Sequence, residues 1–153
     1  MALFSKITEI YTPVTGKLIE LEKVPDEMFA QKMLGDGFAV EPSENIIRCP
    51  IDGKVVMVSE NGYAFGLKNK RGLEVLIHIG IDTVNLQGKG FKMMLKEGQS
   101  VKAGDKAVEL DFDFLKKENY PITTMIVITS GEKIKKLFKI DEIVTPDEIV
   151  ATA

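Results

Sequence analysis

Short stretches of alternating hydrophobic and polar residues, punctuated by glycine, run along most of this chain. A period of two over about four to eight residues predicts β-strands, and Asn-Gly, Ser-Gly and Gly-Asp pairs between such stretches predict tight turns. The expected strands span residues 17–21, 38–41, 54–58, 64–68, 73–79, 107–111, 124–129 and 134–139.

These short strands predict an all-β fold, an antiparallel β-sandwich or barrel-sandwich hybrid with short helical turns. A parallel α/β fold would need helices of about ten or more residues between strands, and only residues 26–34 and 113–119 have helical character. The length of 153 residues and the hydrophobic content of 44% suit one core. We therefore expect residues 1–153 to form a single domain.

One sequence pattern occurs twice. Residues 13–18 (PVTGKL) are echoed by residues 50–55 (PIDGKV), each time as a turn that leads into an apolar strand. The echo favours a sandwich built from two related halves. Residues 101–105 (VKAGD) are expected to form another tight connection.

Charge and rare residues narrow the class of protein. The chain has 20 basic and 23 acidic residues, a net charge of −3, and no basic block, which argues against nucleic acid as a partner. Cys49 is the only cysteine, so one chain can form no disulfide, and a reducing cytoplasm is the expected compartment. Since there is also only one histidine, we expect no metal and no cofactor.

No apolar run approaches the roughly 18 residues of a membrane span, and the N-terminus shows no apolar core of a secretion signal. We therefore expect contact with a membrane only through a partner. Leu3, Phe4, Ile7 and Ile10 lie near helical spacing. A frayed terminus or a turn packed on the domain is favoured here over an amphipathic turn that binds a membrane or partner.

His78 is the chief candidate for chemistry. It lies near the end of an apolar strand, on the same face as Leu76 and Glu74. Imidazole is a nucleophile near neutral pH when one nitrogen holds the proton and the other presents its lone pair. The carbonyl of Gly80 can accept that N–H, and Asp82 adds a carboxylate nearby. These residues alone leave both a structural and a reactive histidine open.

Other chemistries fit less well. One histidine and one cysteine are too few for a zinc hydrolase, and no G-x-S-x-G motif marks a nucleophilic serine, although a Ser-His-Asp arrangement stays open. The glycine pairs in residues 35–37 and 88–90 match neither a P-loop nor a dinucleotide-binding motif. Lys92, with the turn at 101–105, weakly resembles the lysine hairpin of biotin- or lipoyl-carrying domains.

The segment IHIGIDTV at residues 77–84 resembles the glucose-type enzyme IIA domains of the bacterial sugar phosphotransferase system. Further segments match the family's order and spacing along nearly the whole chain: residues 24–29, 33–37, 49–53, 64–67 and 97–105. The resemblance implies an antiparallel β-sandwich whose histidine takes a phosphoryl group from phospho-HPr and passes it to the IIB domain of a sugar permease.

The resemblance also implies roles for individual residues. His78 would carry the phosphoryl group, and the carbonyl of Gly80 would hold the nearer ring nitrogen. An apolar docking face would exclude water during transfer, with acidic residues at its rim to steer a basic donor. The residues assigned to this face and its rim are Met28, Phe29, Leu34, Phe65, Leu76 and Val84, with Asp26 and Asp82.

One departure from the family stands beside the reactive histidine. The family carries a second histidine directly before Ala-Phe-Gly-Leu, where this chain has Tyr63, and a threonine two residues earlier, where it has Asn61. Tyrosine keeps an O–H donor but cannot become cationic to balance a phosphate charge. We expect phosphorylation of His78 to persist and onward transfer to be slowed or lost.

Two functions follow from this departure. In the first, Tyr63 and Asn61 substitute adequately and the protein is a working phosphocarrier. In the second, it is a regulatory or binding module whose partners respond to roughly two added negative charges on phosphorylated His78. The sequence does not name the sugar, the permease or a regulated protein.

Overall fold

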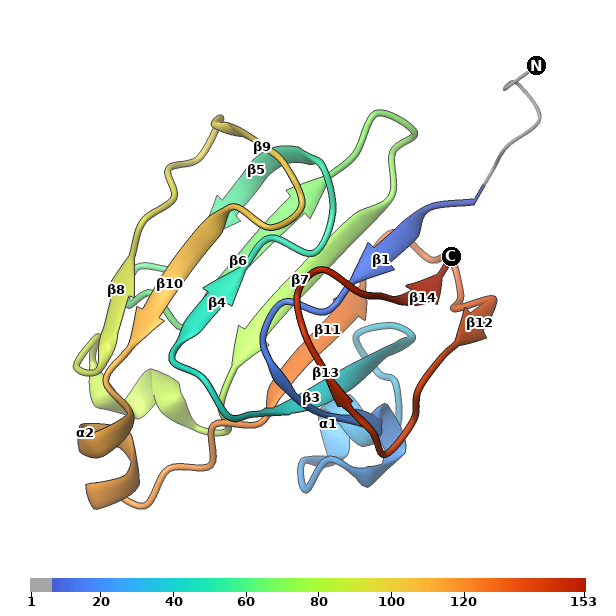
Figure 1. Cartoon of the computed structure of the whole chain (residues 1–153). Coiled ribbons are helices and arrows are strands. Elements are labelled where there is room, and N and C mark those ends of the chain that lie inside the picture. Colours follow the sequence, from blue (N-terminus) through green and yellow to red (C-terminus); the bar gives the residue numbers. More distant parts are fainter. Residues whose placement is uncertain (1–6) are drawn as a thin grey trace.

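The computed structural model describes residues 7–153 as three sheets of antiparallel strands (Figure 1). The largest has the order β13-β2-β3-β11-β7-β6-β5-β9, and the smaller two have the orders β1-β14-β12 and β4-β10-β8. The strands are β1 Glu9–Tyr11, β2 Gly16–Glu20, β3 Gly37–Pro42, β4 Ile46–Arg48, β5 Gly53–Val58, β6 Ala64–Lys68, β7 Glu74–Ile79, β8 Phe91–Met93, β9 Ser100–Val101, β10 Lys106–Leu110, β11 Thr124–Ile128, β12 Lys136–Leu137, β13 Ile143–Val144 and β14 Ile149–Thr152.

The expected all-β antiparallel fold is confirmed. Seven expected strands coincide closely with β2, β3, β5, β6, β7, β10 and β11, whereas the one expected at residues 134–139 is reduced to the two residues of β12. The sequence pattern missed β1, β4, β8, β9, β13 and β14. These strands have only two to four residues each, too few to show a period of two.

The helices are shorter than expected. Among the described residues they are η2 Leu21–Lys23, α1 Glu27–Ala30, η3 Thr83–Leu86 and α2 Phe112–Lys117. Asp26 begins α1 by accepting a 3.0 Å hydrogen bond from the Met28 N–H, and Asp111 begins α2 in the same way with Phe114. Lys32, with a φ of 59°, then turns the chain out of helical conformation.

The repeated sequence pattern has a structural cause. Each copy leads into a strand that begins at its glycine, β2 at Gly16 and β5 at Gly53. A Cβ atom at Gly16 would collide with the carbonyl oxygen of Glu41, and one at Gly53 would collide with that of Lys68. Both turns therefore need glycine because a neighbouring strand passes close by.

The tight connection expected at residues 101–105 joins β9 to β10. Within it, Lys102 N donates to Asp105 Oδ2 over 2.8 Å, and Gly104 has a φ of 95°.

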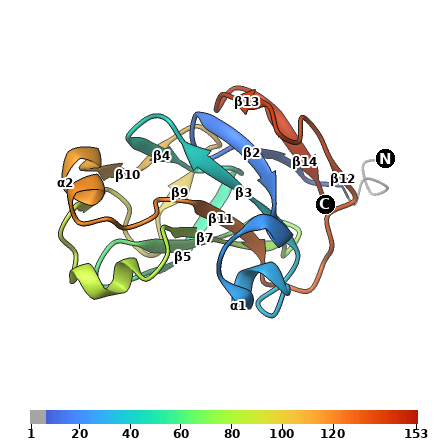
Figure 2. The same ribbon diagram turned by 90° about the horizontal axis from the view of Figure 1, so that it is seen from below.

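Strand β7 lies between two hydrophobic clusters. Val75, Ile77 and Ile79 point into the main core, to which all three sheets contribute side chains. On the opposite side of the large sheet, the η2–α1 segment covers β3 and β11 (Figure 2) and encloses a second cluster: Leu21, Val24, Phe29, Ala39, Ile81, Met125 and Val127. The outward face of β7, which carries His78, therefore lies on the side covered by α1.

The expected turn at the N-terminus is only partly described. Leu3 and Phe4 lie outside the described residues, Ile7 is exposed, and Ile10 is fully buried in β1, where it pairs with Ala151. Ile10 therefore belongs to a strand and not to a helical turn. No helix within residues 7–153 has the length and apolar character needed to cross a bilayer.

The two faces of β7 differ in their contribution to stability. We expect Ile77→Ala to lower the free energy of unfolding by about 2–5 kcal/mol, because it leaves a cavity in the main core. Leu76→Ala, on the outward, half-buried face, should lower it much less. Urea unfolding of both variants checks this, and equal losses would contradict the assignment of the two faces.

Candidate active site around His78

His78 is the penultimate residue of β7 and is half-buried. It pairs with Ala64 of β6 on one side and Met125 of β11 on the other, both of which are buried. A central position in the eight-stranded sheet fixes the backbone of His78 on both sides. The side chain is therefore presented from a rigid element and not from a loop.

The carbonyl oxygen of Gly80 lies 3.0 Å from His78 Nδ1. A carbonyl can only accept a hydrogen bond, so Nδ1 carries the proton and donates it. In the neutral ring, the lone pair is then on Nε2, which makes Nε2 the nucleophilic atom.

This hydrogen bond depends on the backbone after β7. Gly80 has a φ of 82°, and a Cβ atom there would collide with the Thr83 methyl group and lie 2.8 Å from the carbonyl oxygen of Pro121. The Gly80 N–H donates to the carbonyl of Thr123 over 2.9 Å, and the Thr83 hydroxyl donates to that of Ile79 over 2.6 Å. Only glycine fits this position without strain.

Two aromatic rings flank the imidazole. The ring centroid of Phe29 lies 5.1 Å away at an interplanar angle of 57°, and that of Tyr63 lies 5.2 Å away at 65°. Burial lowers the pKa of His78 below its ordinary value of 6.5, while the hydrogen bond to Gly80 and the charge of Asp26 oppose that shift. The net effect keeps the ring neutral, and hence nucleophilic, near neutral pH.

Of the two carboxylates expected at the rim, Asp26 acts on the ring electrostatically, from the start of α1. Asp82 is exposed, precedes η3 and has a φ of 61°. Among the described residues, no hydrogen bond or ion pair links the Asp82 side chain to His78.

Several apolar side chains remain exposed near these elements. Met28 is 49% exposed, Val84 46% and Leu34 38%, while Leu76 is half-buried on the same strand face as His78. Phe29 is almost fully buried beside the imidazole. An apolar surface of this kind is typical of a site that excludes water when a partner docks.

Comparisons with known proteins agree with this geometry. The family model for the phosphoenolpyruvate-dependent sugar phosphotransferase system, EIIA 1, matches residues 8–134. The chain belongs to this EIIA 1 family. It is therefore a phosphotransferase component that acts as a phosphocarrier through a phosphohistidine.

Relatives and a solved structure resemble most of this EIIA 1 chain. A Buchnera aphidicola protein named "PTS system glucose-specific EIIA component" is 43% identical over 135 residues, which cover 88% of this chain and 84% of the relative. A Staphylococcus epidermidis protein of the same name is 40% identical over 132 residues, 86% and 80% of the two chains. The structure of glucose permease IIA from Mycoplasma capricolum has a TM-score of 0.91 and 37% identity and covers 99% of both chains.

One residue assigned to the docking face of this EIIA 1 chain was placed wrongly. Phe65 is fully buried in the main core, because it pairs with Ile77 and shares the inward face of the sheet. Conversely, two exposed apolar side chains were not singled out from the sequence: Met33, which is 70% exposed after α1, and Met57, which is exposed beside Gly66. A β-bulge between Val55 and Met57 turns Met57 outward, and no local pattern reveals that bulge.

The remaining candidates of the EIIA 1 chain lie elsewhere. Asn61 is next to Gly88, and within residues 7–153 no hydrogen bond links it to His78. Lys92 pairs with Glu109 in the middle of β8, not at a hairpin tip, so the resemblance to a biotin- or lipoyl-carrying lysine is wrong. Burial raises the pKa of the Cys49 thiol to about 12, which leaves it unreactive. Residues 7–153 contain no group of three or more side chains suited to hold a metal ion.

The causes of the low His78 pKa can be separated by two variants. Phe29→Ala admits water to the imidazole and should raise its pKa toward 6.5, whereas Asp26→Asn removes an attractive charge and should lower it further. Asparagine can still begin α1, so the second variant keeps the helix. NMR titration of the ring protons measures both shifts.

The sign of the pH effect on stability follows from the same shift. Because the folded protein holds the His78 proton more weakly than the unfolded chain does, this group destabilises the fold as pH falls below 6.5 and has no such effect well above it. A His78 pKa above 6.5 in the unmodified protein would contradict this account of the site.

Proposed function

We propose that Nε2 of His78 accepts a phosphoryl group from phospho-HPr and passes it to the IIB domain of a sugar permease. The observation that carries the proposal is the contact between Nδ1 and the carbonyl of Gly80, which leaves Nε2 with its lone pair. The chain has no other histidine, so a phosphohistidine intermediate requires His78. We propose further that residues 1–153 act as one domain.

The transfer needs no cofactor, because in each of its two steps one bond to phosphorus forms as another breaks. The lone pair of Nε2 attacks phosphorus as the bond from phosphorus to the donor's histidine nitrogen breaks, and the donor ring leaves with those electrons. The proton on Nδ1 stays in its hydrogen bond to Gly80 throughout. In the second half-reaction, an acceptor side chain on the IIB domain attacks the same phosphorus, and Nε2 recovers its lone pair.

The apolar surface around His78 supports docking of both partners. Met28, Leu34 and Val84 expose enough apolar area to contact a partner and exclude water from a phosphoryl group in transit. Asp26 and Asp82 add negative charge at the edge, which suits a donor with basic side chains. We include Leu76, Met33 and Met57 in this docking surface.

The names of the relatives suggest the acceptor to test first. Two relatives are named glucose-specific, and the similar structure is a glucose permease IIA. We propose a glucose-type permease as the acceptor and the cytoplasm as the place of exchange.

Tyr63 sets the rate of the second step in this proposal. Its ring meets the imidazole in a T-shaped contact, and its carbonyl accepts a 2.7 Å hydrogen bond from the Ile79 N–H, which fixes Tyr63 beside the site. The phenol can donate a hydrogen bond to a bound phosphoryl group but brings no positive charge. The missing charge-assisted bond corresponds to about 1.5–3 kcal/mol.

The two steps can be measured with separate variants. Phospho-HPr should label the unmodified protein on His78, and His78→Ala should abolish the label. On addition of a IIB domain, we expect Tyr63→His to release the label about ten- to a hundredfold faster than the unmodified protein does, if the charge acts only in the transition state.

Tyr63→Phe is the matched control, because it keeps the ring and removes only the hydroxyl. It should accept the label normally and transfer it more slowly than the unmodified protein. Absence of label on intact protein would refute the carrier function. If no IIB domain removes the label, even from Tyr63→His, onward transfer would be refuted. The remaining interpretation would then be a regulatory module that is phosphorylated on His78.

A further inference from the structure

A second concave surface lies at the opposite end of β6 and β7 from His78. There, β1, the first residues of β5, strand β9 and the β6–β7 turn line a cavity of about 1310 Å³. Ile51 and Val101 contribute buried apolar surface to its wall. This volume exceeds the roughly 300–1,000 Å³ of common ligand clefts, so a small organic molecule fits.

The cavity concentrates positive charge in a chain that is negative overall. Of the residues within 7–153 that line it, six are basic and three are acidic, although the chain has a net charge of −3. The basic residues come from several separate segments of the chain: Arg48, Lys54, Lys68, Lys70, Arg71 and Lys102. Their convergence is therefore a product of the fold and not of a basic stretch in the sequence.

Two of the three acidic residues have partners within the protein. Asp52 accepts a 2.8 Å hydrogen bond from the Ala103 N–H and lies 4.0 Å from Lys102 Nζ, and Asp147 accepts one from the Thr145 hydroxyl. The negative charges of Asp52 and Asp147 are therefore partly offset by hydrogen bonds and an ion pair with neighbouring residues. Among the described residues, Glu9 is the remaining carboxylate of the cavity, and it is exposed.

Lys54 and Lys68 stand directly opposite each other on β5 and β6. Like charges in directly opposed positions of antiparallel strands destabilise a sheet. Glu74 lies 3.7 Å from Lys68, but within residues 7–153 no carboxylate lies within 4.0 Å of Lys54. A dianion between the two lysines would relieve this repulsion.

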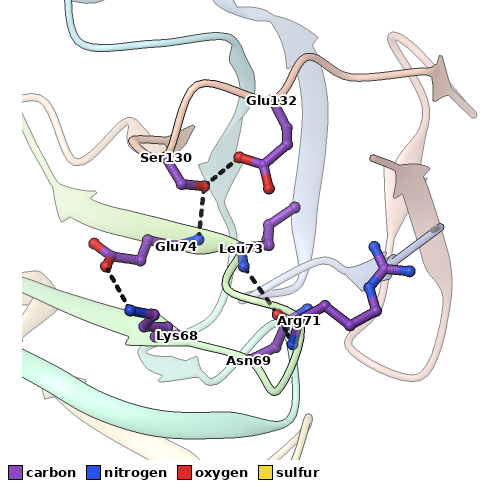
Figure 3. A network of polar contacts seen from close by, with 7 residues as sticks. All are labelled: Lys68, Asn69, Arg71, Leu73, Glu74, Ser130 and Glu132. Atoms are coloured by element: carbon purple, nitrogen blue, oxygen red, sulfur yellow. Dashed lines mark hydrogen bonds and ion pairs between the residues drawn. The ribbon is translucent and has the colours of Figure 1, made fainter.

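The two arginines of the cavity are held in place. Arg48 Nη1 donates to the carbonyl of Gly104 over 2.9 Å, which leaves its other N–H groups for a ligand. Arg71 Nη2 donates to Thr8 Oγ1 over 3.0 Å. The turn that carries Arg71 is fixed because Asn69 Oδ1 accepts hydrogen bonds from the N–H groups of Arg71 and Leu73 (Figure 3).

We propose that this cavity binds a small organic anion with at least two negative charges, such as a phosphate ester. Its concave shape and its apolar wall favour a small molecule. Lys68 lies four positions along β6 from Ala64, the neighbour of His78, which is a distance of about 13 Å. The cavity is therefore distinct from the phosphorylation site. The proposal for it does not depend on the function proposed for His78.

Titration with fructose 1,6-bisphosphate, followed by amide NMR, tests the proposal. We expect saturable shifts confined to residues 48, 52–54, 68–72 and 101–104, with a dissociation constant below about 1 mM. Uncharged fructose should cause none. Lys54→Gln combined with Lys68→Gln should weaken binding at least tenfold, whereas Lys117→Gln, an exposed lysine on α2, should leave it unchanged.

The double variant removes the repulsion between the two lysines together with the exposed ion pair of Lys68 and Glu74, so its unfolding temperature should change little, which separates loss of binding from loss of fold. Shifts that do not saturate by about 10 mM would overturn the proposal. Equal weakening by Lys117→Gln would also overturn it, as would binding to phosphatidylglycerol vesicles without binding to the soluble ester. Phosphorylation of His78 is measured separately and tests only the carrier function.

Discussion

The hydrogen bond from His78 Nδ1 to the carbonyl oxygen of Gly80 determines which nitrogen of the ring can react. It exists because the chain turns sharply after β7 through a glycine with a φ of 82°, where Thr83 and Pro121 leave no room for a side chain. A residue with a side chain there would shift the Gly80 carbonyl and break its hydrogen bond to Nδ1, so either ring nitrogen could then hold the proton. The choice of reactive atom thus follows from backbone packing more than from the histidine itself.

The sheet supplies the rest of the site by separating its two faces. Along β7, Val75, Ile77 and Ile79 hold the strand in the main core, while His78 points to the side where α1 places Phe29. This partial burial lowers the pKa of the imidazole without enclosing it. A rigid strand, a neutral ring and an open apolar surface are what direct transfer of a phosphoryl group between two proteins requires.

Local features of this site could be predicted from sequence, and long-range ones could not. His78 and Gly80 are two residues apart, so strand alternation and the following glycine were enough to anticipate their contact. Phe65 was assigned to the docking surface by resemblance, yet its cross-strand partner is Ile77, which places it in the core. Met57 was missed because a bulge in β5 turns it outward, and the convergence of basic residues near Lys54 depends on segments far apart in sequence.

The central claim is that Gly80 fixes the proton on Nδ1 and leaves Nε2 to carry the phosphoryl group. Long-range nitrogen–proton NMR spectra of protein labelled with ¹⁵N-histidine, recorded before and after phosphorylation, test it directly. We predict a neutral ring protonated on Nδ1 before the reaction and a phosphorus–nitrogen bond at Nε2 after it. A ring protonated on Nε2, or a phosphoryl group on Nδ1, would contradict the account.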